Sequence, residues 1–214
     1  MRYCVQFVFA VVAAIVASPA VAAEKQAPSS ADPVQAIWQQ KEISFSYQSV
    51  TTFYSCSSLE TKIRRILLAV GANPGIKFRM RGCFSRHEIA RYPYVEITLV
   101  SPVEATPEAL AERDKTRSTR ELAARVRGQT EAAKEAEKEF PAMWKQVSLS
   151  RGKLYLEPGD CELVEQLSEK VFPKLGIRVI EDDVRCTPNQ VSMNQPRLVV
   201  EALVPVPKPD EKSN

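Results

Sequence analysis

The most constraining feature of this 214-residue chain is a pattern that occurs twice, each time with its own pair of cysteines. In both copies a tryptophan is followed by a cysteine, by a glycine that ends an apolar stretch, and by a second cysteine: Trp38, Cys56, Gly71 and Cys83, then Trp144, Cys161, Gly176 and Cys186. Matched prolines follow each second cysteine. The shared order predicts a tandem duplication of one structural unit.

The residue pattern within each copy predicts the element order β-α-β-β. Apolar residues fall at helical spacing over residues 56–71 and 163–175, and Pro173 is expected to kink or end the second helix. Runs typical of strands follow the helices, at residues 76–83, 95–100, 177–184 and 198–204. The predicted fold class is α+β, with an antiparallel-rich sheet, one helix and one disulfide in each unit, and a charged helical linker between the units.

The chain divides into six predicted segments. They are a signal peptide at 1–23, a flexible segment at 24–35, repeat unit 1 at 36–103, the linker at 104–141, repeat unit 2 at 142–206 and a disordered tail at 207–214. The linker contains helix-capping signals but few large apolar residues, so we expect a solvated helical connector. A partner-binding helix and a disordered segment are the alternatives.

The first 23 residues have the composition of a bacterial secretory signal. Arg2 precedes an apolar run over Val5–Ala17, and small residues precede the expected cleavage site. The apolar run is shorter than the roughly 20 residues that cross a bilayer, so removal is favoured over an uncleaved membrane anchor. The sequence therefore predicts a periplasmic or secreted protein with no transmembrane segment after signal removal.

The spacing of the four remaining cysteines predicts how they pair. A helix over residues 56–71 rises about 24 Å, and a returning strand over 76–83 covers about 26 Å. The strand end therefore returns beside the helix start, so Cys56 is expected to pair with Cys83, and Cys161 with Cys186. Four cysteines allow three pairings. A zinc site is the alternative, but the chain lacks a C-x-x-C pair, and we expect no metal and no cofactor.

No arrangement of residues in the sequence indicates a catalytic site. His87, the only histidine, lies in a polar loop, and the adjacent Glu181, Asp182 and Asp183 read as a solvated strand end. We find no G-x-S-x-G, phosphate-binding or H-E-x-x-H motif. The sequence thus favours a non-enzymatic binding protein; the alternatives are a structural subunit of an envelope complex and a hydrolase whose site lies between the two units.

One strand separates the two copies by charge. Lys77, Arg79 and Arg81 alternate with apolar residues, so all three are expected on one strand face, and Arg86 and Arg91 follow in the next loop. Residues 36–103 hold nine Lys and Arg against four Asp and Glu, whereas residues 142–206 hold eight against nine. The basic face predicts an anionic envelope component or an acidic protein as partner, and not nucleic acid. An ordinary solvated sheet face is the alternative.

The matching face of the second copy is apolar. Ile180, Val199 and Leu203 occupy it where the first copy has charged or smaller residues. Leaving such side chains in water forgoes about 1.5 to 3 kcal/mol each. We therefore expect this face to be covered by the first copy, by the linker or by a second protomer.

Overall fold

The computed structural model describes residues 32–83, 89–126, 128, 138–149, 154, 156–187, 189–191 and 193–207. The elements in chain order are β1 (Val34–Ser46), α1 (Cys56–Ala69), β2 (Lys77–Arg81), β3 (Tyr94–Glu104), α2 (Pro107–Lys115), α3 (Arg117–Val126), β4 (Phe140–Ser148), the 3-10 helix η1 (Pro158–Asp160), α5 (Cys161–Lys170), α6 (Phe172–Leu175), β5 (Arg178–Asp183) and β6 (Arg197–Pro205). The predicted signal peptide lies outside the described residues. None of the helices in these ranges is long and apolar enough to cross a membrane.

The six strands form one antiparallel sheet in the order β2-β3-β1-β4-β6-β5. The predicted mixture of helices with an antiparallel sheet is therefore confirmed, although the strands join into one sheet where two had been expected. The join is a seam between β1 and β4 of only three residue pairs: Val34 with Ala142, Gln35 with Pro141, and Ala36 with Phe140. Val34 and Gln35, expected to be flexible, thus belong to this seam.

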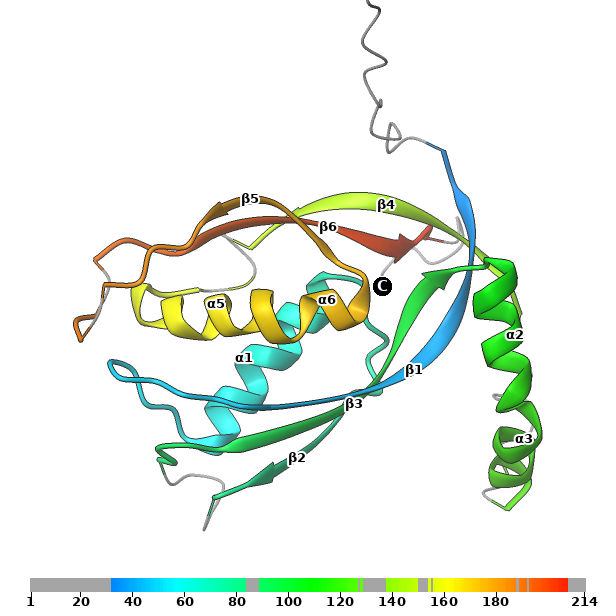
Figure 1. Ribbon diagram of the computed structural model, residues 1–214, viewed down its shortest axis with the longest axis horizontal. Coiled ribbons are helices and arrows are strands. Elements are labelled where there is room, and N and C mark those ends of the chain that lie inside the picture. Colours follow the sequence, from blue (N-terminus) through cyan, green and yellow to red (C-terminus); the bar gives the residue numbers. More distant parts are fainter. Residues whose placement is uncertain are drawn as a thin grey trace, which may run out of the picture.

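Beyond the seam the two halves of the sheet diverge, and α1 and α5 lie between them (Figure 1). Each half has the order strand, helix, strand, strand, and in each the last strand lies between the other two. The main core draws on both halves, with Ile43 of β1, Leu59 and Ile63 of α1, and Leu163 and Leu167 of α5 in one cluster. Because the halves share this core, neither buries its own helix alone.

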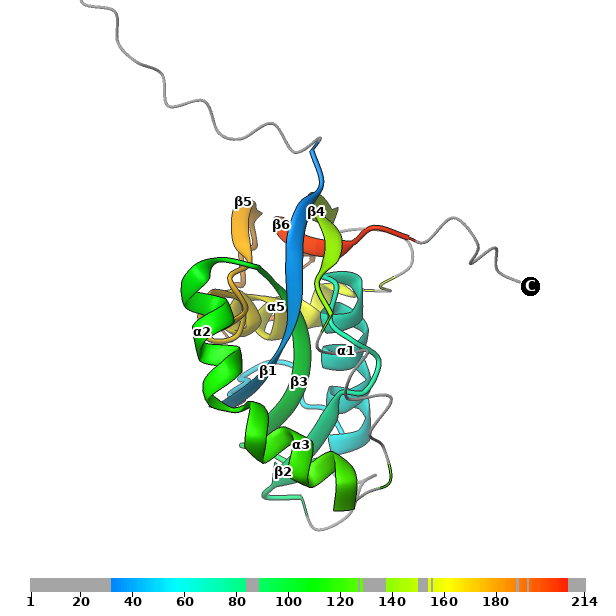
Figure 2. The same cartoon turned by 90° about the vertical axis from the view of Figure 1, so that its right-hand side faces the viewer.

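The helices α2 and α3 run along one end of the molecule, outside the layer that holds α1 and α5 (Figures 1 and 2). The side chain of Thr106 caps α2 by accepting a hydrogen bond from the Ala109 backbone N–H at 3.2 Å. Neither helix contributes to the main core. These two helices of the predicted linker are therefore largely exposed, as the scarcity of large apolar residues predicts. The ends of the linker differ from the prediction, because Glu104 belongs to β3, and Phe140 and Pro141 belong to β4.

The helix ends follow local signals in the sequence. Ser55 caps α1 through its side chain, and Gly71 ends it in the left-handed region at φ 92°. The second helix breaks at Val171, directly before the α6 segment that contains Pro173, and Gly176 at φ 73° ends it. The predicted effect of Pro173 is thus present, because a proline inside a helix removes a backbone donor and crowds the preceding turn.

Both predicted disulfides are present. Cys56 is the first residue of α1 and pairs with Cys83, which follows β2, at a sequence separation of 27. Cys161 is the first residue of α5 and pairs with Cys186, which follows β5, at a separation of 25. On the chain-entropy model each contributes about 3 kcal/mol of stability. Their presence fits a protein outside the reducing cytoplasm.

Replacing Gly71 by alanine is expected to destabilise the fold more than the same change at Gly176. Both residues have positive φ, which costs an alanine about 1 to 2 kcal/mol. At Gly71 the added Cβ would also lie 2.8 Å from the backbone oxygen of Leu203 in β6, whereas at Gly176 nothing lies within 4 Å. Urea unfolding of the two variants measures the difference, and equal losses would show that the approach of α1 to β6 is not tight.

Candidate functional site

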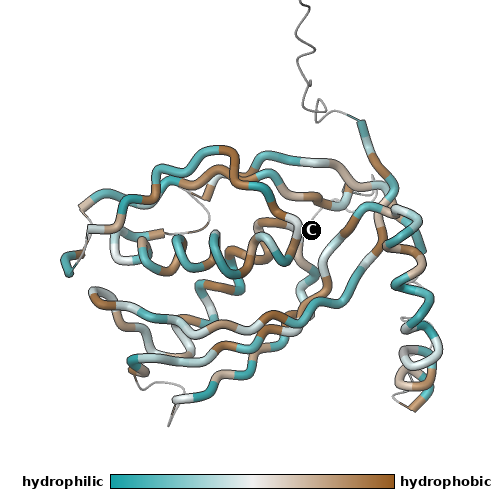
Figure 3. The backbone as a smooth tube through the Cα atoms, in the orientation of Figure 1, coloured by the Kyte–Doolittle hydropathy of each residue, from teal (hydrophilic) through white to brown (hydrophobic). Residues whose placement is uncertain are grey.

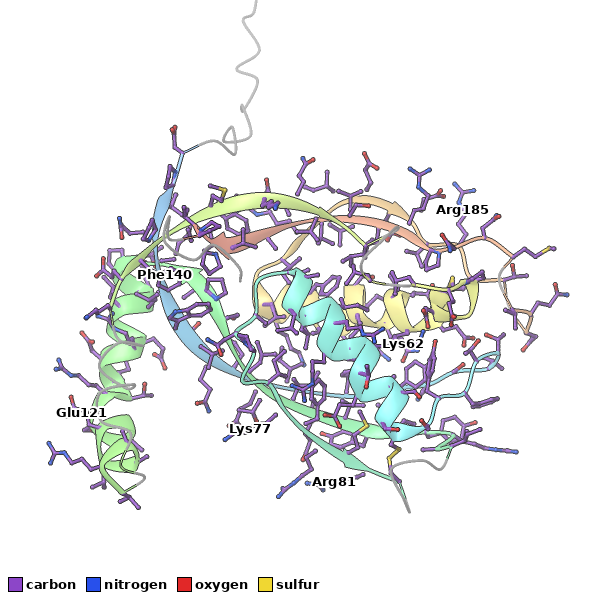
Figure 4. The ribbon with its side chains drawn as sticks, turned by 180° about the vertical axis from the view of Figure 1, so that it is seen from behind. Lys62, Lys77, Arg81, Glu121, Phe140 and Arg185 are labelled. Carbon is purple, nitrogen blue, oxygen red and sulfur yellow. A yellow bond between two sulfur atoms is a disulfide. The ribbon has the colours of Figure 1, made fainter. Side chains whose placement is uncertain are left out.

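The basic residues predicted on one strand face lie on β2, at the edge of the sheet. Lys77, Arg79 and Arg81 are exposed, and Phe78 and Met80 between them are half-buried and pack on the main core. Figure 4 shows Lys77 and Arg81 pointing away from the body of the molecule. The alternation places three cationic side chains on the outer face of the sheet.

A carboxylate on the neighbouring strand offsets part of this charge. Glu96 lies directly opposite Arg79 in the β2–β3 register. Its oxygens are 2.8 Å from Arg81 Nη2 and 3.9 Å from Arg79 Nε. Lys77 lies opposite Thr98 and has no acidic partner among the residues that the structure describes. The edge therefore retains positive charge, with Lys77 and the exposed parts of the two arginines carrying it.

The outer faces of β1, β2 and β3 form an open hollow of about 710 Å³ beside these residues. Lys77 and Arg79 line it together with Glu42 and Glu96, so the hollow itself holds equal numbers of positive and negative side chains. The excess of positive charge lies at the rim, where Arg81 also stacks over the Tyr94 ring at 5.9 Å. A partner attracted by charge would thus contact the strand edge more than the floor of the hollow.

The two remaining residues of the predicted site follow β2 in the chain. Arg91 is exposed and lies just before β3, next to Tyr92, which is also exposed. Arg86 lies outside the described residues, as does His87. Of the five predicted binding residues the structure thus describes four, three along β2 and Arg91 just before β3.

The apolar face of the second copy is not covered at Ile180 by the first copy or by the linker. This side chain is 47% exposed, although Val199 is half-buried and Leu203 is buried. All six residues of the edge strand β5 are exposed, and an irregularity in its pairing with β6 between Val179 and Glu181 leaves Ile180 out of the register as well. Sequence alternation assumes unbroken pairing, so it could not anticipate this.

Leu203 is buried for a reason that the sequence did not indicate. It packs with Ala36 and Ala142 at the seam, beside Phe140 and Trp144. The seam therefore accounts for the burial of Leu203, and no second protomer is needed to cover this side chain.

A second polar group, unrecognised in the sequence, lies between the two halves. Asp160 is 1% exposed; its carboxylate lies 2.8 Å from Lys62 Nζ and accepts hydrogen bonds from the Tyr54 hydroxyl and, at 2.8 Å, the Glu157 backbone N–H. Burial, followed by the hydrogen bond to Asp160, raises the pKa of Tyr54 far above its ordinary range. Figure 4 labels Lys62 in this region. All of these groups have partners, which is typical of a structural cluster.

Glu162 holds the loop after β1 in place. Its carboxylate accepts hydrogen bonds from the Ser49 hydroxyl and from the backbone N–H groups of Val50 and Thr51. Burial alone raises the pKa of Glu162, but these hydrogen bonds outweigh burial and hold the pKa below its ordinary value. One turn along α5, burial and then the charge of Glu169 raise the pKa of Glu165.

These carboxylates bear on the alternative of a hydrolase with its site between the halves. Such a site needs two carboxyl groups that converge in a cleft, with the pKa of at least one raised. Glu165, whose pKa is raised, lies one turn from Glu162 on α5, but none of Asp160, Glu162 and Glu165 lines the hollow over β2. Within the described ranges, no group of three His, Cys, Asp or Glu side chains is arranged to hold a metal ion. The geometry therefore supports a structural role for the polar cluster around Asp160.

Searches with this chain against protein-family models, curated proteins and solved structures find no match.

The opposite pKa changes of Glu162 and Glu165 predict opposite effects on acid stability. The lowered pKa of Glu162 means that its stabilisation is present above its unfolded-state pKa, near 4.5, and is lost as the pH falls. The raised pKa of Glu165 has the reverse sign, so that its protonation favours the folded state. Glu162→Gln should therefore reduce the loss of stability on acidification, and Glu165→Gln should increase it.

Urea unfolding of the wild type and both variants, at about pH 7 and about pH 3, measures these changes. An equal pH dependence in all three proteins would contradict the assignment of Glu162 as the residue that holds the loop.

Proposed function

We propose that this protein is a non-enzymatic binding protein of the bacterial periplasm, or a secreted one, that engages an anionic envelope component or an acidic protein through β2. The single observation that supports this is the exposure of Lys77, Arg79 and Arg81 on the same face of an edge strand. The signal-like N-terminus and the two disulfides support the compartment.

The position of β2 at the sheet edge favours an extended partner. One side of an edge strand has backbone N–H and C=O groups that its own sheet does not pair, and an added strand can use them. The side chains of Lys77 and Arg79 would then select for negative charge on that strand. A linear anionic polymer would use the charges without the backbone pairing.

We propose further that the two halves arose by tandem duplication and that only the first kept a basic edge. The equal element order, equal strand order and equal placement of the disulfides support the duplication. The strand of the second half that corresponds to β2 is β5, which holds Glu181, Asp182 and Asp183. Opposite charge on corresponding edges is what divergence of one binding edge would produce.

Removing the three charges of β2 should weaken binding to anionic material without unfolding the protein. The variant Lys77→Ser, Arg79→Ser, Arg81→Ser should lose affinity about tenfold, because each exposed pair contributes up to about 1 kcal/mol. Retention on immobilised poly-glutamate and co-sedimentation with phosphatidylglycerol vesicles measure the loss and distinguish a protein-like from a lipid-like partner. Added salt should weaken the wild type on the same supports, since exposed charges are screened.

The matched control removes the same charge from the second half, at three exposed cations: Lys145→Ser, Lys174→Ser and Arg197→Ser. This control should bind as the wild type does. If the control and the β2 variant lose affinity equally, binding depends on net charge and not on β2, and the proposal fails.

A second candidate function is that of a subunit in an envelope complex, docked through α2 and α3. The observation that favours it is that Leu122 and Val126, one turn apart on α3, are 64% and 82% exposed. Figure 3 shows hydrophobic residues at the free end of this pair of helices. An exposed apolar pair on a protruding helix is typical of a site that a partner covers.

Crosslinking in the native envelope tests this second function. Leu122→Ser with Val126→Ser should abolish capture of a stoichiometric partner, whereas the β2 variant should retain it. Equal capture by all variants would contradict docking through α3.

A further inference from the structure

A recess separate from the β2 edge lies where the two half-sheets diverge from the seam. Its volume is about 280 Å³, and its walls come from the end of α1, β3, α2, β4, the turn after α6, and β6. These elements meet in the right half of Figure 1. The lining is mainly apolar and includes Val70, Val103, Ala109, Leu175, Ile177 and Leu203.

The few polar groups of the recess differ in whether they are already partnered. The Trp144 indole N–H donates to Glu104 at 2.5 Å, and the Thr106 side chain caps α2. Ser101, which also lines the recess, is 5% exposed, and its hydroxyl has no hydrogen-bond partner among the described residues. A buried hydroxyl without a partner is costly in a folded protein, so an occupant that supplies one would be stabilising. The oxygen is enclosed in the free protein, so pairing with an occupant requires the Ser101 side chain to rotate about its Cα–Cβ bond toward the recess.

The walls of the recess are held in place by contacts outside it. The Trp144 ring lies 4.5 Å from the Arg178 guanidinium. These residues are on β4 and β5, and β6 lies between the two strands and pairs with both. At the end of α1, Gly71 approaches the backbone of Leu203 so closely that a Cβ there would clash. The recess is thus formed by fixed elements, which lowers the entropic cost of binding.

We propose that this recess binds a small, neutral, mainly apolar molecule with one hydrogen-bonding group that pairs with Ser101. The volume is near the lower end of the range for ligand sites, about 300 to 1,000 Å³, so the molecule is small. The apolar lining selects for an apolar body. The Glu104 carboxylate in the wall disfavours an anion, which separates this ligand from the anionic partner proposed for β2.

Fluorescence titration with N-phenyl-1-naphthylamine tests the proposal, because this neutral probe is apolar and carries a single N–H group. The mature protein should bind it saturably at one site. Ala109→Phe, which fills the recess from α2, should lower the affinity at least about tenfold. The matched control is Ala111→Phe, an exposed position on the same helix, which should leave the affinity unchanged.

Ser101→Ala tests the hydrogen bond without filling the recess. It should raise the melting temperature of the free protein, because it removes an unpaired buried hydroxyl, and lower the affinity for the probe about threefold to tenfold. The anionic 1-anilinonaphthalene-8-sulfonate should bind more weakly than the neutral probe.

The proposal is overturned if the wild type shows no saturable binding, or if Ala109→Phe and Ala111→Phe bind equally. Unchanged affinity in Ser101→Ala would overturn the assignment of the hydrogen-bonding group. Should Ala109→Phe fail to fold, saturable binding by the wild type together with the loss of affinity in Ser101→Ala decides the outcome, and unchanged affinity in Ser101→Ala then overturns the proposal.

Discussion

Three residue pairs between β1 and β4 join the two halves of this protein into one sheet. Because the seam is short, the half-sheets are free to diverge beyond it and enclose α1 and α5. The enclosed side chains form one core, and the contacts of Asp160 with Lys62 and Tyr54 cross the same space. Both the core and this polar cluster exist only when the halves meet, so the seam and the interior depend on each other.

The parts of the fold that depend on neighbouring residues were predictable from the sequence. The pairing of Cys56 with Cys83 follows from the rise of a helix and of the strand after it. The break before α6 follows from Pro173, and the common face of Lys77 and Arg79 follows from strand alternation. In each case the deciding physics acts within about 30 residues of chain, a span that fixed backbone dimensions can bridge.

The features that the sequence did not reveal depend on register between distant segments. Glu96 offsets part of the charge of the basic edge because β3 pairs with β2 in a particular alignment. Ile180 is exposed because it lies on β5, an edge strand whose residues are all exposed, and alternation along one strand carries no signal for that. The recess beside Ser101 is assembled from several elements, so its apolar side chains look like ordinary core residues in the sequence.

Each disulfide closes within one half of the molecule, and neither crosses the seam. A pulling force applied between the two halves would therefore meet no bridging covalent bond, apart from the linker itself. It would load the three backbone pairs of the seam and the shared core. Inside each half, the start of the helix would remain joined to the end of the following strand by the disulfide. Under tension the molecule has one compliant plane between two covalently stiffened parts, and any partner that grips both halves would stiffen that plane.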